Sequence, residues 1–307
     1  MTTSTPFALS DVEDGETRPD RPDGPGEPGA AAVVVGADGT ECGLEAVKWA
    51  AQEAARRDAP LRIMHAIPAP RRRGGADPAP APPHARRITA QAYTVAKHTE
   101  AGVRSVTEVV AGDAAKVLLT AAAEGQLVVL GKSTTGAADE WVLAPVAVKV
   151  AARSPRPVVL VPRPRGEVAG RPVSAVLGLG EPADDELVAD FAAEAAYRAG
   201  TPLSVLQVRR HRAVPDDWTQ DDSEWEQRFP GLEVRRSELA HATAAQVLAA
   251  ASPAPLMVLS AGHGSLLHRD LDGPHRWLLR HCTSPMALVP PVHRPELDPH
   301  EEIIAVG

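Results

Sequence analysis

The sequence predicts an α/β fold made of two tandem, doubly wound domains, each with a five-stranded parallel sheet. Short continuous apolar runs alternate with segments of helical periodicity, which is typical of parallel sheets covered by helices on both faces. The same order of elements occurs twice along the chain. A length of 307 residues, 44% of them hydrophobic, is sufficient for two such cores.

An internal repeat is the strongest of these observations. WAAQEAARRDAPLRIMHAI (49–67) aligns without a gap with FAAEAAYRAGTPLSVLQVR (191–209), at an offset of 142 residues. Further along, PRPVVLVP (155–162) matches TSPMALVP (283–290) at an offset of 128. The offset falls because the first copy carries a longer Pro- and Arg-rich insertion at 68–87. Gap-free matching of this length indicates two homologous domains.

Each copy is expected to alternate strand and helix with right-handed crossovers. In the first copy the apolar runs predict strands at about 31–36, 61–67, 104–110, 126–131 and 157–162. The helical spacings predict helices at about 42–57, 86–101, 112–124 and 144–153. In the second copy strands are expected near 173–179, 202–209, 232–237, 255–260 and 285–290.

These elements lie between two acidic tails that together account for the whole net charge. Residues 1–29 form an acidic Pro/Gly-rich tail, expected to be disordered, that contributes −5 to the net charge of −8. The two domains are expected at 30–165 and 171–291, followed by a C-terminal tail at 292–307. The last 17 residues contribute −3, so the body of the chain is formally neutral. A neutral body argues against nucleic acid or a membrane surface as partner.

The predicted location is the cytoplasm. No apolar run approaches the roughly 20 residues that span a bilayer, and the N-terminus lacks the basic and apolar regions of a signal peptide. Cys42 and Cys282 lie far apart and are expected to be buried or half-buried free thiols.

The chain resembles the universal stress protein family in its tandem form. The resemblance rests on VVVGADGT (33–40), LRIMHAI (61–67), VVAGDAAKVLLTAAAEGQLVVLG (109–131) and APVAVKVAARSPRPVVLVP (144–162). It implies a five-stranded fold like that of the adenine nucleotide alpha hydrolases, and some members of the family bind ATP. In that family the last strand often pairs two domains.

The last strands of the two copies are expected to pair here as well. PRPVVLVP and SPMALVP are apolar, and left open they would be edges prone to association. Pairing them closes both edges within one chain. This predicts an intramolecular pseudo-dimer, with a homodimer of the whole chain as a further possibility.

The glycine-rich phosphate loop that the resemblance implies is damaged in both copies. The family has Gly, Gly, Gly and then Ser or Thr at four spaced positions. The residues at these positions are Gly131, Thr134, Ala144 and Pro145 in the first copy and Ser260, His263, Gly273 and Pro274 in the second. Proline suits a helix start but has no N–H to donate to a phosphate.

If either copy holds a nucleotide, the sequence favours the first. The resemblance implies that an Asp after the first strand faces the nucleoside; Asp38 occupies this position, whereas the second copy has Gly180. The alternative role for Asp38 is a helix cap or turn. The candidate nucleotide-binding residues are Ala37, Asp38, Gly39, Thr40, Ile67, Gly131, Ser133 and Thr134. ATP is the possible ligand, and no cofactor is certain.

Other features are interpreted structurally. Lys132 is read as a solvated loop lysine rather than an anion ligand, and Trp218 and Trp225 as packing residues of a short amphipathic helix. The histidines at 263, 268, 275 and 281 have no metal-ligand spacing. No nucleophile–base set or Walker-type lysine motif supports catalysis or ATP hydrolysis.

The sequence therefore predicts a non-catalytic stress-response binding protein with an unknown protein partner. The alternative is an ATP-binding sensor that uses the first domain.

Overall fold

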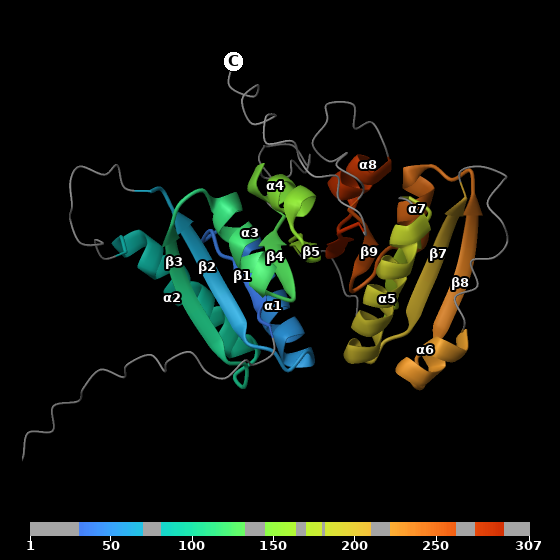
Figure 1. Ribbon diagram of the computed structural model, residues 1–307, viewed down its shortest axis with the longest axis horizontal. Coiled ribbons are helices and arrows are strands. Elements are labelled where there is room, and N and C mark those ends of the chain that lie inside the picture. The colour runs from blue at the N-terminus through green and yellow to red at the C-terminus, as the bar shows by residue number, and fades with distance from the viewer. Residues whose placement is uncertain are drawn as a thin grey trace, which may run out of the picture.

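The two halves of the chain form one continuous ten-stranded sheet (Figure 1). The computed structural model describes residues 31–69, 81–132, 145–163, 170–179, 182–209, 222–261 and 274–291. The strand order is β3-β2-β1-β4-β5-β10-β9-β6-β7-β8. Every neighbouring pair is parallel except β5–β10, which is antiparallel. The predicted fold class is therefore confirmed.

The first half follows the expected alternation of strand and helix. Its strands are β1 (Val33–Gly36), β2 (Leu61–Ile67), β3 (Ser105–Ala111), β4 (Leu127–Gly131) and β5 (Val158–Val161). Its helices are α1 (Glu41–Arg56), α2 (Pro83–Thr99), α3 (Ala114–Glu124) and α4 (Pro145–Arg153). All of them lie within the predicted domain range 30–165.

The second half repeats this order, with the short helix α6 in the position of the longer α2. Its strands are β6 (Val173–Leu177), β7 (Leu203–Arg209), β8 (Val234–Ala240), β9 (Met257–Ser260) and β10 (Met286–Val289). Its helices are α5 (Pro182–Ala199), α6 (Asp222–Arg228), α7 (Ala244–Ala251) and α8 (Pro274–His281).

Helix α6 confirms the packing role predicted for Trp225. This side chain is 3% exposed and belongs to the core. Its indole N–H donates to Asp190 Oδ1 of α5 at 3.3 Å, so the polar end of the buried ring has an acceptor. Trp218 lies outside the described residues.

The pairing of β5 with β10 joins the two domains and confirms the expected pseudo-dimer. Val159 lies opposite Ala287 in the antiparallel register. These residues are 128 apart, which makes them equivalent positions of the two repeats. The pseudo-twofold axis therefore passes between them.

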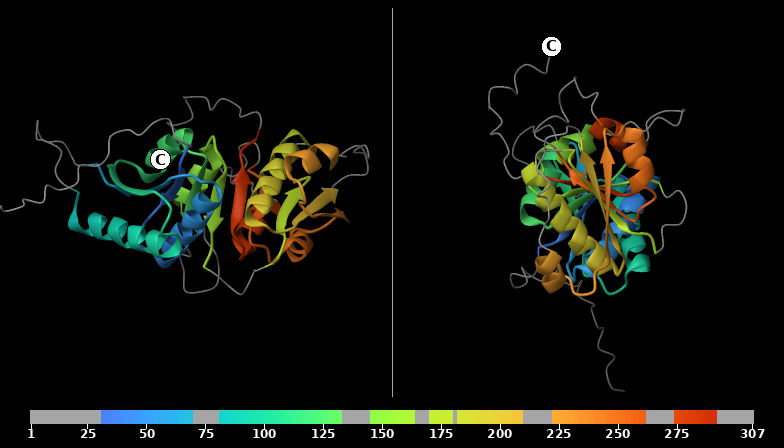
Figure 2. Two further views of the ribbon diagram at one scale, coloured as in Figure 1. Left: turned by 90° about the horizontal axis from the view of Figure 1, so that it is seen from below. Right: turned by 90° about the vertical axis from the view of Figure 1, so that its right-hand side faces the viewer.

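This pairing also merges the two hydrophobic cores. One buried cluster joins residues of α1, α2, α5 and α6 on one face of the sheet, and the other joins α3, α4, α7 and α8 on the opposite face. Figure 2 shows helices on both sides of the twisted sheet. Val159 and Ala287 belong to the first cluster, whereas Leu160 and Met286 belong to the second. Each core layer thus crosses the domain boundary.

Within the described ranges, no helix is both long and apolar enough to cross a membrane.

A carboxylate at the centre of the β5–β10 pairing is expected to destabilise the whole chain. Val159 is fully buried, so Val159→Asp should lower the free energy of unfolding by about 3 kcal/mol or more. The matched control is Val106→Asp in the edge strand β3, where the side chain is 48% exposed and the loss should be about 1 kcal/mol. Urea denaturation of both variants measures the difference. Equal losses would show that the pairing of the last strands contributes little.

Candidate functional site

The candidate site lies at the carboxyl edge of β1, β2 and β4, where parallel strands present ligands. Ala37 directly follows β1 and is buried, with its N–H donating to the Met64 carbonyl at 2.8 Å. His65 Nδ1 lies 2.7 Å from the Ala37 carbonyl. These two contacts fix the point at which the chain leaves the sheet for α1.

Asp38, Gly39 and Thr40 form the turn between β1 and α1. Asp38 Oδ1 accepts hydrogen bonds from the N–H and the hydroxyl of Thr40, at 2.9 and 2.7 Å. Gly39 has φ +80°, a conformation that favours glycine. Thr40 is the N-cap of α1, and its hydroxyl accepts from Gly43 N–H at 3.0 Å. Asp38 thus has the turn-forming role that the sequence left as an alternative, while its contact with a nucleoside stays a prediction.

Gly131 ends β4 beside the first turn of α1 and has a packing role. A Cβ at this position would lie 2.7 Å from the Cys42 carbonyl carbon and oxygen and from Gly43 N. Any side chain would therefore push α1 away from the sheet. Helix packing is a sufficient reason for this glycine, so its match to the phosphate-loop motif does not by itself indicate phosphate binding.

The remaining predicted residues are only partly brought together. Ile67 ends β2, and its carbonyl accepts from Gly112 N–H at 2.8 Å, which places it next to the connection from β3 to α3. Ser133 and Thr134 lie outside the described residues. The structure thus brings Ala37–Thr40 and Gly131 together around the start of α1, with Ile67 further along the same edge of the sheet.

Sequence reasoning missed Arg163 at this site. Arg163 follows β5, and its guanidinium donates to the carboxylate of Glu41 in the first turn of α1. It also contacts the Cys42 thiol, whose pKa is raised because the thiol is buried, while the charge of Arg163 acts in the opposite direction. No motif marks this arginine. Its position two residues after a parallel strand was the available signal.

The equivalent place in the second domain carries two buried carboxylates. Asp184 and Asp185 in the first turn of α5 are 2% and 6% exposed, and at the repeat offset of 142 they replace Cys42 and Gly43. Asp184 Oδ2 accepts from the Ser260 hydroxyl at 3.0 Å. Ser260 occupies the position of Gly131 at the offset of 129.

Asp185 is bound at the end of the neighbouring strand. Both of its carboxylate oxygens lie 3.0 Å from the N–H of Gly178, which follows β6. Burial raises the pKa of Asp185 to about 6; the Gly178 hydrogen bond lowers it and the nearby Asp184 raises it further. The two domains therefore place different charged groups at equivalent sites, an arginine paired with Glu41 in the first and two buried aspartates in the second.

Both phosphate-loop prolines begin a helix, as expected. Pro145 is the first residue of α4 and Pro274 the first residue of α8. Fixed φ and a missing N–H suit the first helical position. For the same reason neither residue supplies a backbone donor there.

The interpretation of Lys132 as a solvated lysine is wrong. Its side chain is 3% exposed, and Nζ donates to the Cys282 carbonyl at the end of α8 at 2.6 Å. A lysine of the first domain thus caps the C-terminus of a helix of the second. Burial lowers its pKa to about 8, an effect that the nearby Cys282 partly opposes. Cys42 and Cys282 are buried free thiols, as expected.

Two of the histidines lie within a described helix. His281 stacks on Trp277 with ring centroids 4.0 Å apart, and its Nδ1 lies 2.9 Å from the Trp277 carbonyl. His263 and His268 lie outside the described residues. In the part of the chain that the structure describes, no three His, Cys, Asp or Glu residues are grouped to hold a metal ion.

Comparison with known proteins agrees with this geometry. A family model described as the universal stress protein family matches residues 31–162, the first domain. A universal stress protein of Mycobacterium tuberculosis is 25% identical over 295 residues, covering 83% of this chain and 93% of the relative. Another, of Mycolicibacterium smegmatis, is 26% identical over 285 residues, covering 84% and 97%.

Residues 31–162 thus match the universal stress protein family, and tandem members of that family are similar to this chain over both halves. A crystal structure of a universal stress protein from Archaeoglobus fulgidus shares the fold with a TM-score of 0.60 at 14% identity, covering 84% of this chain and 98% of that one. Both relatives and this structure extend over the two domains, so the tandem form is shared.

The buried amine of Lys132 should make the stability of the protein depend on alkaline pH. The pKa of Lys132 is lower in the folded than in the unfolded chain, so burial of the protonated amine lowers the free energy of unfolding at neutral pH. This loss of stability shrinks as the pH rises from the folded toward the unfolded pKa. The unfolding free energy of the wild type, relative to Lys132→Met, should rise by about 2 kcal/mol between about pH 7 and about pH 9.5. Urea denaturation across this range checks it. A constant difference between the two proteins would contradict the assignment.

Asp185→Asn should stabilise the protein at neutral pH. Because the pKa of Asp185 is higher in the folded chain, its stability contribution falls as pH rises between about 4 and 7. The amide keeps an acceptor for Gly178 N–H, so the variant should unfold with about 2 kcal/mol more free energy at about pH 7 and with no gain near pH 4. Thermal or urea unfolding at both pH values tests this. A gain of equal size at both would exclude titration of Asp185 as its cause.

Proposed function

We propose that this chain is a cytoplasmic, non-catalytic regulatory protein of the stress response, with nucleotide sites that are degenerate in both domains. Its function is carried by contacts with a protein partner. The observation that supports this is a proline at the start of the helix at both sites. Pro145 and Pro274 begin the two helices whose N-termini would bind the phosphate in the family's loop. Neither residue has an N–H to donate.

The second domain gives further support. A phosphate at its site would approach the buried carboxylates of Asp184 and Asp185, which already occupy the first turn of α5. Like charges at close range in a region of low dielectric repel strongly. Ser260 is also engaged with Asp184, so this domain is disfavoured as a nucleotide site on both steric and electrostatic grounds.

A second candidate function, an ATP-binding sensor, is supported by the first domain alone. Asp38 and Thr40 are exposed at the turn after β1. Arg163 adds a cation beside the start of α1, and its partner Glu41 is itself 64% exposed. Such an exposed ion pair is worth little and exchanges readily for a phosphate.

Calorimetry with ATP and Mg²⁺ separates the two functions. The wild type is compared with Asp38→Ala and Thr40→Ala. The matched control is Thr243→Ala, because Thr243 caps α7 in the second domain in the same way as Thr40 caps α1. The proposed function predicts no detectable heat in any of the four proteins, and no nucleotide released when the purified protein is denatured.

Binding in the micromolar range would instead support the sensor, provided that it is lost in Asp38→Ala and Thr40→Ala and kept in Thr243→Ala. The stoichiometry is then expected to be one nucleotide per chain, because of the carboxylates in the second domain. Two nucleotides per chain would contradict both candidate functions, because each of them excludes a nucleotide from the second domain.

A further inference from the structure

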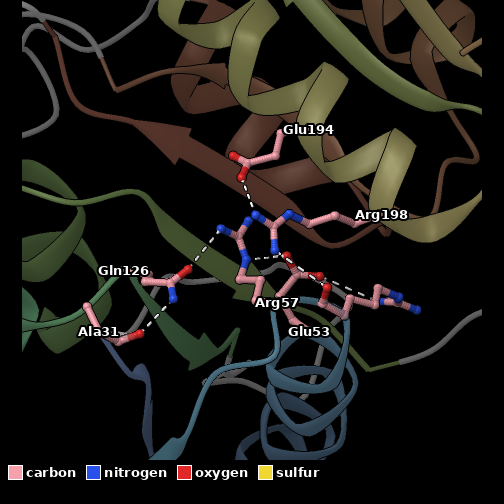
Figure 3. A network of polar contacts seen from close by, with 7 residues as sticks. Ala31, Glu53, Arg57, Gln126, Glu194 and Arg198 are labelled. Atoms are coloured by element: carbon pink, nitrogen blue, oxygen red, sulfur yellow. Dashed lines mark hydrogen bonds and ion pairs between the residues drawn. The ribbon is translucent and has the colours of Figure 1, made fainter. Parts of the chain in front are cut away.

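Arginines from both domains meet at the C-terminal end of α1. Arg56 and Arg198 are 142 residues apart, so they are equivalent positions of the two repeats. Arg198 Nη1 lies 3.5 Å from the Arg56 carbonyl, across the domain boundary. Figure 3 shows Arg57 reaching from the end of α1 toward Arg198 and Glu194 on α5. We refer to Arg56, Arg57 and Arg198 as the seam arginines.

Arg57 is the buried member of this group. Its side chain is 5% exposed, and its Nε donates to Glu53 Oε1 at 2.7 Å. Its Nη1 lies 3.4 Å from Gln126 Oε1, and its guanidinium packs 5.5 Å from the ring centre of Phe191 in the second domain. Its Nη2 is buried and has no hydrogen-bond partner in the described part of the chain. A buried guanidinium N–H without an acceptor is strongly unfavourable, so an acceptor is expected at this position.

The charges of this network do not balance. Glu53 is shared between Arg57 and Arg56, with Arg56 Nη1 at the long distance of 3.4 Å. Glu194 pairs with Arg198 at 2.6 Å. Three guanidinium groups therefore share two carboxylates. The side chains of Arg56 and Arg198 are 36% and 31% exposed, so the rim of the network is open to ions in solution.

We propose that the seam arginines bind a small oxyanion of the phosphate type between the two domains. Such an anion offers several acceptors to planar guanidinium forks, which bind tetrahedral oxyanions well. It would supply the acceptor that Arg57 Nη2 lacks and balance the third positive charge. The ligands of the anion come from both domains, so a bound anion would hold the end of α1 against α5.

This site is separate from the candidate nucleotide site. The nucleotide site lies at the start of α1 and the seam arginines at its end. The helix has 16 residues, which separates the two by about 24 Å. Variants of one site can therefore be tested without altering the other.

Inorganic phosphate is the probe for the test. Its binding to the full chain is measured by calorimetry and by ³¹P line broadening, with chloride at matched ionic strength as the reference. Arg57→Lys keeps a charge for Glu53 but lacks Nη2, and Arg198→Met removes a partly exposed ligand. Each should weaken phosphate binding by about tenfold or more, as expected for a lost charge-assisted hydrogen bond. Arg235→Met removes an exposed arginine of β8 paired with Glu233 and should leave binding unchanged.

Three results would overturn the proposal: no saturable binding up to about 20 mM phosphate, equal binding in wild type, Arg57→Lys and Arg198→Met, or loss of binding in Arg163→Met instead. The last result would place the anion at the nucleotide site. Competition by adenosine monophosphate that still requires Arg57 would identify an esterified phosphate as the ligand. Its absence would identify the free anion.

Discussion

The antiparallel pairing of β5 with β10 is the constraint on which the rest of the molecule depends. It converts two five-stranded sheets into one sheet and removes two apolar edges. Each face of the sheet continues across this antiparallel pair. The helices that cover one face in the two domains therefore lie on the same side, and both core layers are continuous. The contacts of Lys132 with Cys282 and of Arg57 with Phe191 follow from the register that this pairing sets.

The two candidate sites show how a shared fold can keep its packing while its chemistry changes. In the first domain, the close approach of β4 to α1 requires Gly131, with or without a ligand. In the second domain, Ser260 occupies the same position and is bound to Asp184 at the start of α5. The glycine that resembles a binding motif and the aspartates that oppose it are thus alternative ways of joining strand to helix.

The fold could be predicted because its signals are local or repeated. Alternating apolar runs defined the strands, and the gap-free repeat defined the tandem domains. The boundaries shifted where local chemistry decides: α2 begins at Pro83, because proline fits the first helical position, and β8 continues to Ala240, paired along its whole length with β7.

The site was predictable only in part. Asp38 and Thr40 lie in one turn whose chemistry is visible in GADGT. Lys132 gave no such signal, because it is buried by the end of α8. Its partner there, Cys282, is 150 residues away along the chain. Asp184 and Asp185 resemble ordinary acids of a first helical turn, and only the packing of α5 against β6 and β9 reveals that they are buried.

The contact between Lys132 and Cys282 exists once in the molecule, because the equivalent residues of the other half are Ala261 and Ser154. In a dimer of identical subunits, every substitution near the axis appears twice, and a buried lysine would have to be accommodated in duplicate. Fusion of two copies into one chain removes that requirement. Each half can then change alone, and the symmetry of the backbone becomes a frame within which the two halves diverge in charge and in role.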